Sequence, residues 1–87
     1  MEEVTPGQWI SLGTDPLTSR DAVVCRVYEE GRIEVVYLDR RDRAINEDAI
    51  WNGERWVFEN PGPGGGYADN CNRLGQYVRK LRAGRYN

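Results

Sequence analysis

The segment PGPGGGY at residues 61–67 comes closer than any other part of the sequence to a phosphate-binding motif. Glycine-rich loops that lead into a helix hold phosphate, but the Walker type also needs a lysine and a serine or threonine at the helix start. Here Tyr67 is followed by an alanine and then by Asp69, whose carboxylate would occupy the place of the anion. We interpret the loop as a hinge whose prolines end a strand and whose glycines let the chain reverse against a sheet. The sequence predicts no nucleotide and no other cofactor.

Candidates for catalysis are few. The chain has no histidine, which excludes serine–histidine and cysteine–histidine nucleophiles and histidine-ligated metals. Cys25 and Cys71 are too few and too distant for a zinc site or a disulfide scaffold, and both lie in apolar patterns typical of packed cysteines. Glu47 and Asp48 are adjacent in a predicted strand, so their carboxylates point to opposite faces. We predict a protein that is not an enzyme and binds no metal.

Aromatic residues supply the candidates for partner binding, and we select Trp51, Trp56 and Tyr67. Aromatic clusters form cages for methylated lysine or platforms for proline-rich peptides. The competing interpretation is that these side chains belong to the core or the sheet surface, as most aromatics do. We expect a protein or peptide partner, bound through an aromatic-rich sheet face.

Basic residues near the C-terminus give an alternative function. The 87 residues carry a net charge of −2, but residues 1–69 hold 14 acids against seven arginines, whereas residues 70–87 hold five cations and no acid. The candidates for binding an anion or a nucleic acid are Arg73, Arg79, Lys80 and Arg82. The acidic remainder of the chain would repel a long polyanion, so we expect nucleic-acid binding to be weak at most.

Length and composition predict a single domain over residues 1–87, with residues 1–7 disordered or loosely held. Two cysteines without a CxxC spacing indicate a reduced, cytoplasmic protein. The N-terminus is acidic and lacks an apolar run, so we expect neither a signal peptide nor a membrane-spanning segment. The sequence leaves the oligomeric state open.

Residues 22–38 carry the clearest strand signal. Two runs rich in valine, isoleucine and tyrosine flank Glu29-Glu30-Gly31, which predicts a three-residue hairpin loop with a left-handed glycine. This loop places Arg26 opposite Glu34, a favourable cross-strand pair. The same register gathers one apolar face, formed by Val23, Cys25, Val27, Ile33, Val35 and Tyr37. Ala22, Val24, Val36 and Leu38 lie on the other face, so we expect a further element to cover part of it.

Residues 44–59 predict a second hairpin, so that two hairpins span residues 22–59. Asn52-Gly53 is a strong signal for a two-residue turn because both positions need a positive φ. That turn places Trp51 opposite Glu54 and puts Trp51, Trp56 and Phe58 on one face. A three-residue loop would place Trp51 opposite Arg55 instead, and the sequence leaves this register open.

A Gly/Pro loop at residues 60–69 precedes a predicted helix at residues 70–82. One helical face is apolar and consists of Cys71, Leu74, Tyr77, Val78 and Leu81. Asp69 lies where an N-cap is expected, and Gly84 where the helix should end. Gly75 is unfavourable inside a helix by about 1 kcal/mol relative to alanine, which a close approach to the sheet would explain.

Residues 34–69 carry the pattern AINED…W…G…W.F…PGP.GGY, which resembles a group of small uncharacterised bacterial proteins. The resemblance implies no activity and no site residues. The short successive hairpins are similar to small SH3-like or Tudor-like barrels, although a C-terminal helix of this length exceeds what those barrels need. The predicted fold class is α+β: an antiparallel meander of four or five strands (with residues 8–12 as a short first strand), strongly curled or barrel-like, with one C-terminal helix packed on it.

Overall fold

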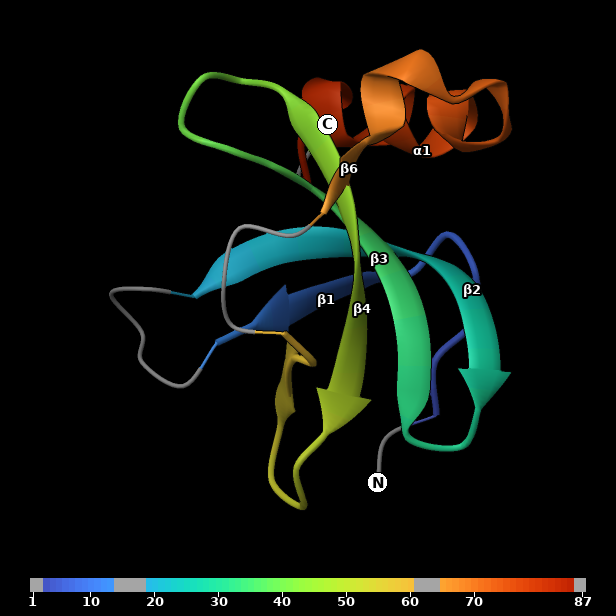
Figure 1. Cartoon of the computed structure of the whole chain (residues 1–87), viewed down its shortest axis with the longest axis vertical. Helices are drawn as coiled ribbons and strands as arrows, with labels where there is room; N and C mark the ends of the chain where they lie inside the picture. Colours follow the sequence, from blue (N-terminus) through green and yellow to red (C-terminus); the bar gives the residue numbers. More distant parts are fainter. Residues whose placement is uncertain (1–2, 14–18, 61–64, 86–87) are drawn as a thin grey trace.

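The protein is described by a computed structural model for residues 3–13, 19–60 and 65–85, shown in Figure 1. The strands are β1 (Trp9–Leu12), β2 (Arg20–Glu29), β3 (Arg32–Leu38), β4 (Ala44–Trp51), β5 (Trp56–Phe58) and β6 (Gly66–Tyr67). Two 3₁₀ turns, Ala68–Asn70 and Asn72–Leu74, lead into the helix α1 (Gly75–Ala83).

The strands form one antiparallel sheet in the order β1-β2-β3-β4-β5, and the short β6 pairs with the start of β4. The sheet curls until its two edge strands meet, where the Gly13 N–H donates to the Trp56 carbonyl at 3.3 Å. In Figure 1, α1 lies at the end of the sheet that carries the β3–β4 turn, and the β2–β3 turn and the segment that begins at residue 3 lie at the opposite end. The predicted fold class, a small curled antiparallel sheet with one C-terminal helix, is confirmed.

The sheet has a hydrophobic cluster on each of its faces. The inner cluster fills the curl and consists of Ile10, Leu12, Ala22, Val24, Ile33, Val35, Ala49 and Trp56. The outer cluster lies between the sheet and the C-terminal segment and consists of Val23, Cys25, Val36, Ala44, Ala68, Leu74, Val78 and Leu81. A further element, mainly α1, covers the outer face of the first hairpin as expected, although only Val36 and Leu38 of the four residues predicted on that face lie there.

The register of the β2–β3 hairpin is partly as predicted. Arg26 lies opposite Glu34 as expected, but a β-bulge at Cys25 shifts the preceding residues by one position. Val24 therefore lies opposite Val35, and Val23 opposite Val36. Because a one-residue shift exchanges the two faces of a strand, the predicted core face is wrong for this half of β2. Val23 and Cys25 face the helix, whereas Ala22 and Val24 enter the curl.

The β2–β3 turn is one residue shorter than predicted. Glu29 pairs with Arg32, and a second irregularity in β2 leaves Tyr28 without a cross-strand partner. Gly31 has the expected positive φ of 84°. Val27, predicted to be part of the core, is 41% exposed although it pairs with Ile33, because β1 pairs only with residues 20–23 of β2 and does not extend alongside Val27.

The β4–β5 turn has four residues, so the predicted two-residue turn is wrong. Trp51 pairs with Trp56, and the Asn52 side chain accepts the backbone N–H groups of Glu54 and Arg55 at 2.9 Å each. This side-chain acceptor stabilises the longer turn, in which Gly53 has a φ of 103°. The register differs from the predicted one by an even number of residues, so the tryptophans share a face as predicted.

The C-terminal helix begins later than predicted. Residues 68–74 form the two 3₁₀ turns, and regular α-helix starts at Gly75, which therefore lies in the first turn rather than in the helix interior. Asp69 does not cap the helix: its side chain accepts the backbone N–H of Ala44 at 3.1 Å and so ties the turn to β4. Gly84 ends the helix with a φ of 90°, as expected.

The hinge interpretation of residues 61–67 is tested only at its end, since residues 61–64 lie outside the described part of the chain. Gly65 packs directly on β4: a Cβ atom there would lie 2.6 Å from the carbonyl oxygen of Asn46 and 2.5 Å from Cγ of Glu47. The predicted close approach of the glycines to the sheet is confirmed at this position.

Candidate functional site

The candidate site is a cleft of about 410 Å³ at the end of the sheet remote from α1. Residues 3–5 of the N-terminal segment form one wall, and residues 29–31 of the β2–β3 turn form another. Val27, Ile33 and Trp56 contribute apolar surface between them. Its volume lies within the range of roughly 300–1,000 Å³ that is usual for ligand sites.

The cleft exists because the N-terminal segment separates from β2. The Gly7 N–H donates to the Val24 carbonyl at 2.8 Å, and the Val24 N–H donates to Gln8 at 2.9 Å. Pro6 precedes this pair and has no N–H to continue the ladder. Among the described residues, no backbone group of residues 3–6 bonds to residues 26–29 of β2. The outer edge of β2 is therefore open along the cleft.

Trp56 joins the cleft to the inner core. Its side chain is only 3% exposed and packs edge-on against Trp51, with ring centroids 5.5 Å apart and planes at 74°. The indole Nε1–H is buried and has no acceptor within the described part of the chain. A buried donor without an acceptor costs on the order of 1–3 kcal/mol, so an acceptor that reached Trp56 from the cleft would bind favourably.

The three aromatic residues selected from the sequence do not form one site. Trp51 and Trp56 meet at the end of β4, but Tyr67 pairs with Ile45 near the start of that strand. Tyr67 is 49% exposed, its hydroxyl accepts a hydrogen bond from Arg43 at 2.9 Å, and the Arg43 guanidinium lies 4.9 Å from its ring centre. Tyr67 therefore belongs to the helix end of the molecule.

The basic residues selected as an alternative site mostly serve the fold. Arg73 forms two hydrogen bonds with Glu34, at 3.0 and 3.1 Å, and Arg82 pairs with Asp69 at 2.9 Å. Lys80 donates to the backbone carbonyl of Gly7. Of the four candidates, only Arg79 has no partner among the described residues. The cations thus hold the C-terminal segment against the rest of the protein instead of converging on one groove.

A polar network on the outside of β2, β3 and β4 was not anticipated from the sequence. Arg32 bridges Asp48 and Glu59 at 3.2 Å each, and Tyr28 donates to Asp48 at 2.9 Å beneath the Arg32 guanidinium. Burial and the hydrogen bond to Asp48 raise the pKa of Tyr28 to about 12. The tyrosine therefore stays protonated at neutral pH and anchors the network as a donor.

Two other side chains with chemical potential are also held in their protonated forms. Burial raises the pKa of the Cys25 thiol to about 12, with a further contribution from Glu34. Burial and a 2.6 Å hydrogen bond to Glu47 raise the pKa of Tyr37 well above its ordinary value. A protonated thiol or phenol is a poor nucleophile, so these groups serve packing and hydrogen bonding.

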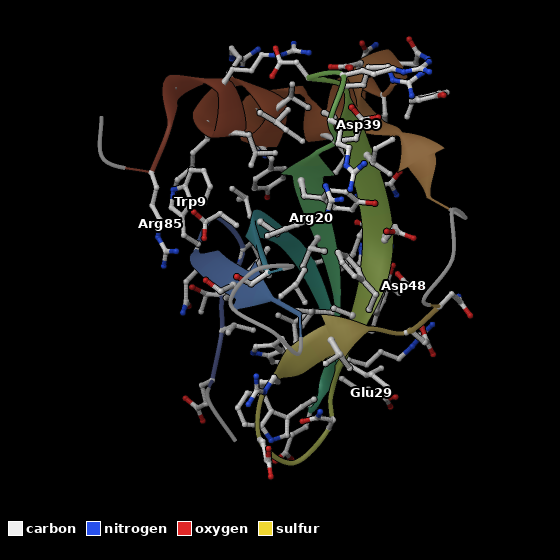
Figure 2. All side chains as sticks on the ribbon, turned by 90° about the vertical axis from the view of Figure 1, so that its left-hand side faces the viewer. Trp9, Arg20, Glu29, Asp39, Asp48 and Arg85 are labelled. Atoms are coloured by element: carbon white, nitrogen blue, oxygen red, sulfur yellow. The ribbon has the colours of Figure 1, made fainter. Side chains whose placement is uncertain are left out.

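Described residues also line two further hollows elsewhere on the surface. One, of about 310 Å³, is lined by Trp9, Arg20 and Arg85, and Figure 2 shows Trp9 and Arg85 close to each other at the left edge of the molecule. The other is polar, has a volume of about 210 Å³ and lies beside Gly65 and Gly66. Within the described residues, no group of acidic side chains or cysteines is arranged to hold a metal ion, and no helix is long and apolar enough to cross a membrane.

The sequence pattern did not identify the residues that line the cleft. Val27 fitted the alternation of a core strand, and Glu29 and Glu30 fitted an ordinary solvated turn. The signal available in the sequence was the pair of adjacent acids, Glu29 and Glu30, in a turn two residues after Val27. No protein-family model matches the chain, and neither the curated proteins nor the solved structures contain a significant match.

Proposed function

We propose that this protein is a non-enzymatic recognition module that binds an extended segment of a partner protein in the cleft beside Trp56. The observation that carries the proposal is the open edge of β2 at residues 26–29, which borders the cleft without a described backbone partner. Extended peptides add to such edges as an extra strand, with backbone hydrogen bonds giving affinity and side-chain pockets giving specificity.

Side chains next to this edge support the same function. Val27 is 41% exposed and lines the cleft, so it offers apolar surface to a ligand. Trp56 lines the cleft, and its buried indole N–H has no acceptor among the described residues. A bound peptide would cover Val27, and a small shift of the lining would let a peptide carbonyl reach the indole.

The alternative function, binding of an anion or a nucleic acid through the basic residues of the C-terminal segment, is less well supported. Arg73, Lys80 and Arg82 are engaged within the protein. A nucleic-acid footprint needs several phosphate contacts, and the helix leaves only Arg79 without a described partner.

Selection from a random peptide library displayed on phage tests the proposal. Enriched peptides are synthesised and titrated into isotope-labelled protein, and amide and indole chemical shifts are followed by NMR. We expect the largest changes at Val27, Gly31 and the indole of Trp56.

Two surface variants make the test specific. Val27→Ser removes apolar area from the cleft and should weaken binding by about tenfold, which corresponds to about 1.4 kcal/mol. Tyr67→Ser removes an exposed aromatic side chain that lies beside the start of β4, outside the cleft, and should leave the affinity unchanged. The proposal fails if no peptide is enriched, or if binding depends on Tyr67 and not on Val27.

A further inference from the structure

The charged side chains that line the cleft are all negative. Glu3, Glu29 and Glu30 line it, and no lysine or arginine does. Figure 2 shows Glu29 at the end of the molecule remote from Asp39 and the helix. An occupant of the cleft therefore meets apolar surface along its length and negative charge at the rim.

These carboxylates differ from most other acids within the described ranges in having no hydrogen-bond or ion-pair partner there. Seven described acids pair with arginine: Asp21, Glu34, Asp39, Asp48, Glu54, Glu59 and Asp69. Glu47 accepts the hydroxyl of Tyr37. Across the described residues, the acidic side chains without a hydrogen-bond or ion-pair partner are those of Glu3, Glu29, Glu30 and Asp42. Three of these four carboxylates line the cleft, where their mutual repulsion would be relieved by a positive charge.

A metal ion does not fit this arrangement. Within the described part of the chain, no three acidic or cysteine side chains come close enough together to share one ion. Carboxylates that are spread around an apolar hollow suit a larger cation with an aliphatic stem. Lysine and arginine side chains have this form, since their methylene groups pack on apolar surface while the charged head stays at the edge.

We propose that the cleft accepts a lysine or arginine side chain of the bound peptide, with its stem along Val27 and Trp56 and its cationic head among Glu3, Glu29 and Glu30. This inference rests on the proposed function and names the chemistry that the site selects. A second, independent feature is Trp56, which lines the same cleft and whose buried indole N–H has no acceptor among the described residues: a peptide supplies carbonyl acceptors, which a free inorganic cation lacks.

Four matched peptides test the inference. The host is acetyl-Ser-Val-Xaa-Val-Ser-amide, with lysine, arginine, norleucine or glutamate at the central position. Norleucine keeps an aliphatic stem and removes the charge. Binding is followed by NMR at the indole of Trp56 and the amide of Gly31. At low salt we expect the two basic peptides to bind about five- to tenfold more tightly than the norleucine peptide, and this advantage to shrink in about 0.5 M NaCl because salt screens exposed charges.

Charge-neutralising variants locate the effect. Glu29→Gln combined with Glu30→Gln should remove most of the advantage of lysine over norleucine. Glu54→Gln makes the same chemical change at an exposed glutamate outside the cleft and should preserve it. Neither variant alters a buried residue, so both should fold.

Several outcomes would overturn the inference. If norleucine binds as well as lysine, the cleft selects apolar peptides, and the proposed function stands without the basic side chain. If the glutamate peptide binds best, or if none of the four binds, the basic side chain is excluded, and the display experiment alone decides the proposed function. If the cleft signals shift with protein concentration and not with added peptide, the occupant is a second copy of this chain.

Discussion

Arg73 and Glu34 are 39 residues apart in the chain and form a two-pronged ion pair, with Nη1–Oε1 and Nη2–Oε2 distances of 3.0 and 3.1 Å. Glu34 lies in β3 and is 5% exposed, whereas Arg73 comes from the 3₁₀ turn before α1. Asn46 of β4 donates a further hydrogen bond to the same carboxylate at 3.2 Å. The pair therefore fixes the start of the C-terminal segment on the outer face of the sheet.

Replacing Arg73 by alanine should destabilise the protein by about 1–3 kcal/mol, because the buried Glu34 carboxylate would lose its charged partner. The Arg73 side chain is 45% exposed, so the cost should fall below that of breaking a fully buried pair. Urea unfolding at neutral pH measures the difference. Arg79→Ala removes an exposed cation from α1 and should change the stability by less than about 0.5 kcal/mol. Equal effects of the two substitutions would show that the ion pair adds nothing to the fold.

The cost of Arg73→Ala should depend on pH. Burial by itself would raise the pKa of Glu34, but the hydrogen bonds and the charge of Arg73 outweigh burial and hold that pKa below its ordinary value of 4.5. A depressed pKa contributes stability above the unfolded-state value, and this stability is lost as the pH falls through the folded-state value. The difference between wild type and Arg73→Ala should therefore be largest at neutral pH and shrink below about pH 4.5.

Urea unfolding of both proteins at pH 7, 5 and about 3 tests this dependence. Other carboxylates titrate in both proteins, so their contributions largely cancel in the difference. A difference that stays constant down to about pH 3 would mean that Arg73 acts through packing and not through the charge of Glu34.

Two glycines should respond oppositely to alanine. A Cβ at Gly65 would lie 2.6 Å from the backbone carbonyl of Asn46, so Gly65→Ala should cost about 1–3 kcal/mol through overpacking against β4. Gly75 has the helical φ of −56°, and the nearest atom to its added Cβ would be 3.9 Å away, at the end of Arg79. Gly75→Ala should therefore stabilise the protein by about 0.4–1 kcal/mol.

Thermal and urea unfolding of the two glycine variants provide the measurement. A neutral effect of Gly65→Ala would show that the segment before β6 can move away from β4 at no cost. A destabilising Gly75→Ala would indicate that the first turn of α1 needs the freedom of glycine.

Nucleic-acid binding should be weak, with a Kd on the order of 10⁻⁴ M or higher at physiological salt. Arg73 and Arg82 are held by Glu34 and Asp69, so they are not free to contact phosphate. Titration of labelled single- and double-stranded oligonucleotides measures the affinity. Submicromolar binding that is lost in the Arg79→Glu, Lys80→Glu double variant, with the fold intact, would favour the alternative function over peptide recognition.

Local sequence patterns determined the number and type of most elements. The valine-rich runs around Gly31 form β2 and β3, and Arg26 pairs with Glu34 as predicted. Both features depend on residues close together in the sequence: a turn glycine with a positive φ and two opposite charges near that turn. The sequence also predicted the apolar face of the helix and the glycine that ends it, although the first residues of the predicted helix form 3₁₀ turns. The two-residue strand β6 was missed because Gly66–Tyr67 is too short to show a strand pattern.

Only the tertiary structure decided which side of β2 faces the helix and where the molecule remains open. The bulge at Cys25 turns Val23 toward α1. The apolar contacts that Val23 makes there depend on Leu74, Val78 and Leu81, which lie far along the chain. The ion pair of Arg73 with Glu34 likewise joins segments that are far apart in the chain. In the sequence, Arg73 fits the solvated face of a helix, and nothing near it points to Glu34 as its partner. The cleft arises where the N-terminal segment leaves β2 and exposes Val27. Alternation along one strand cannot reveal whether a neighbouring segment will cover it, because that depends on contacts between residues far apart in the chain.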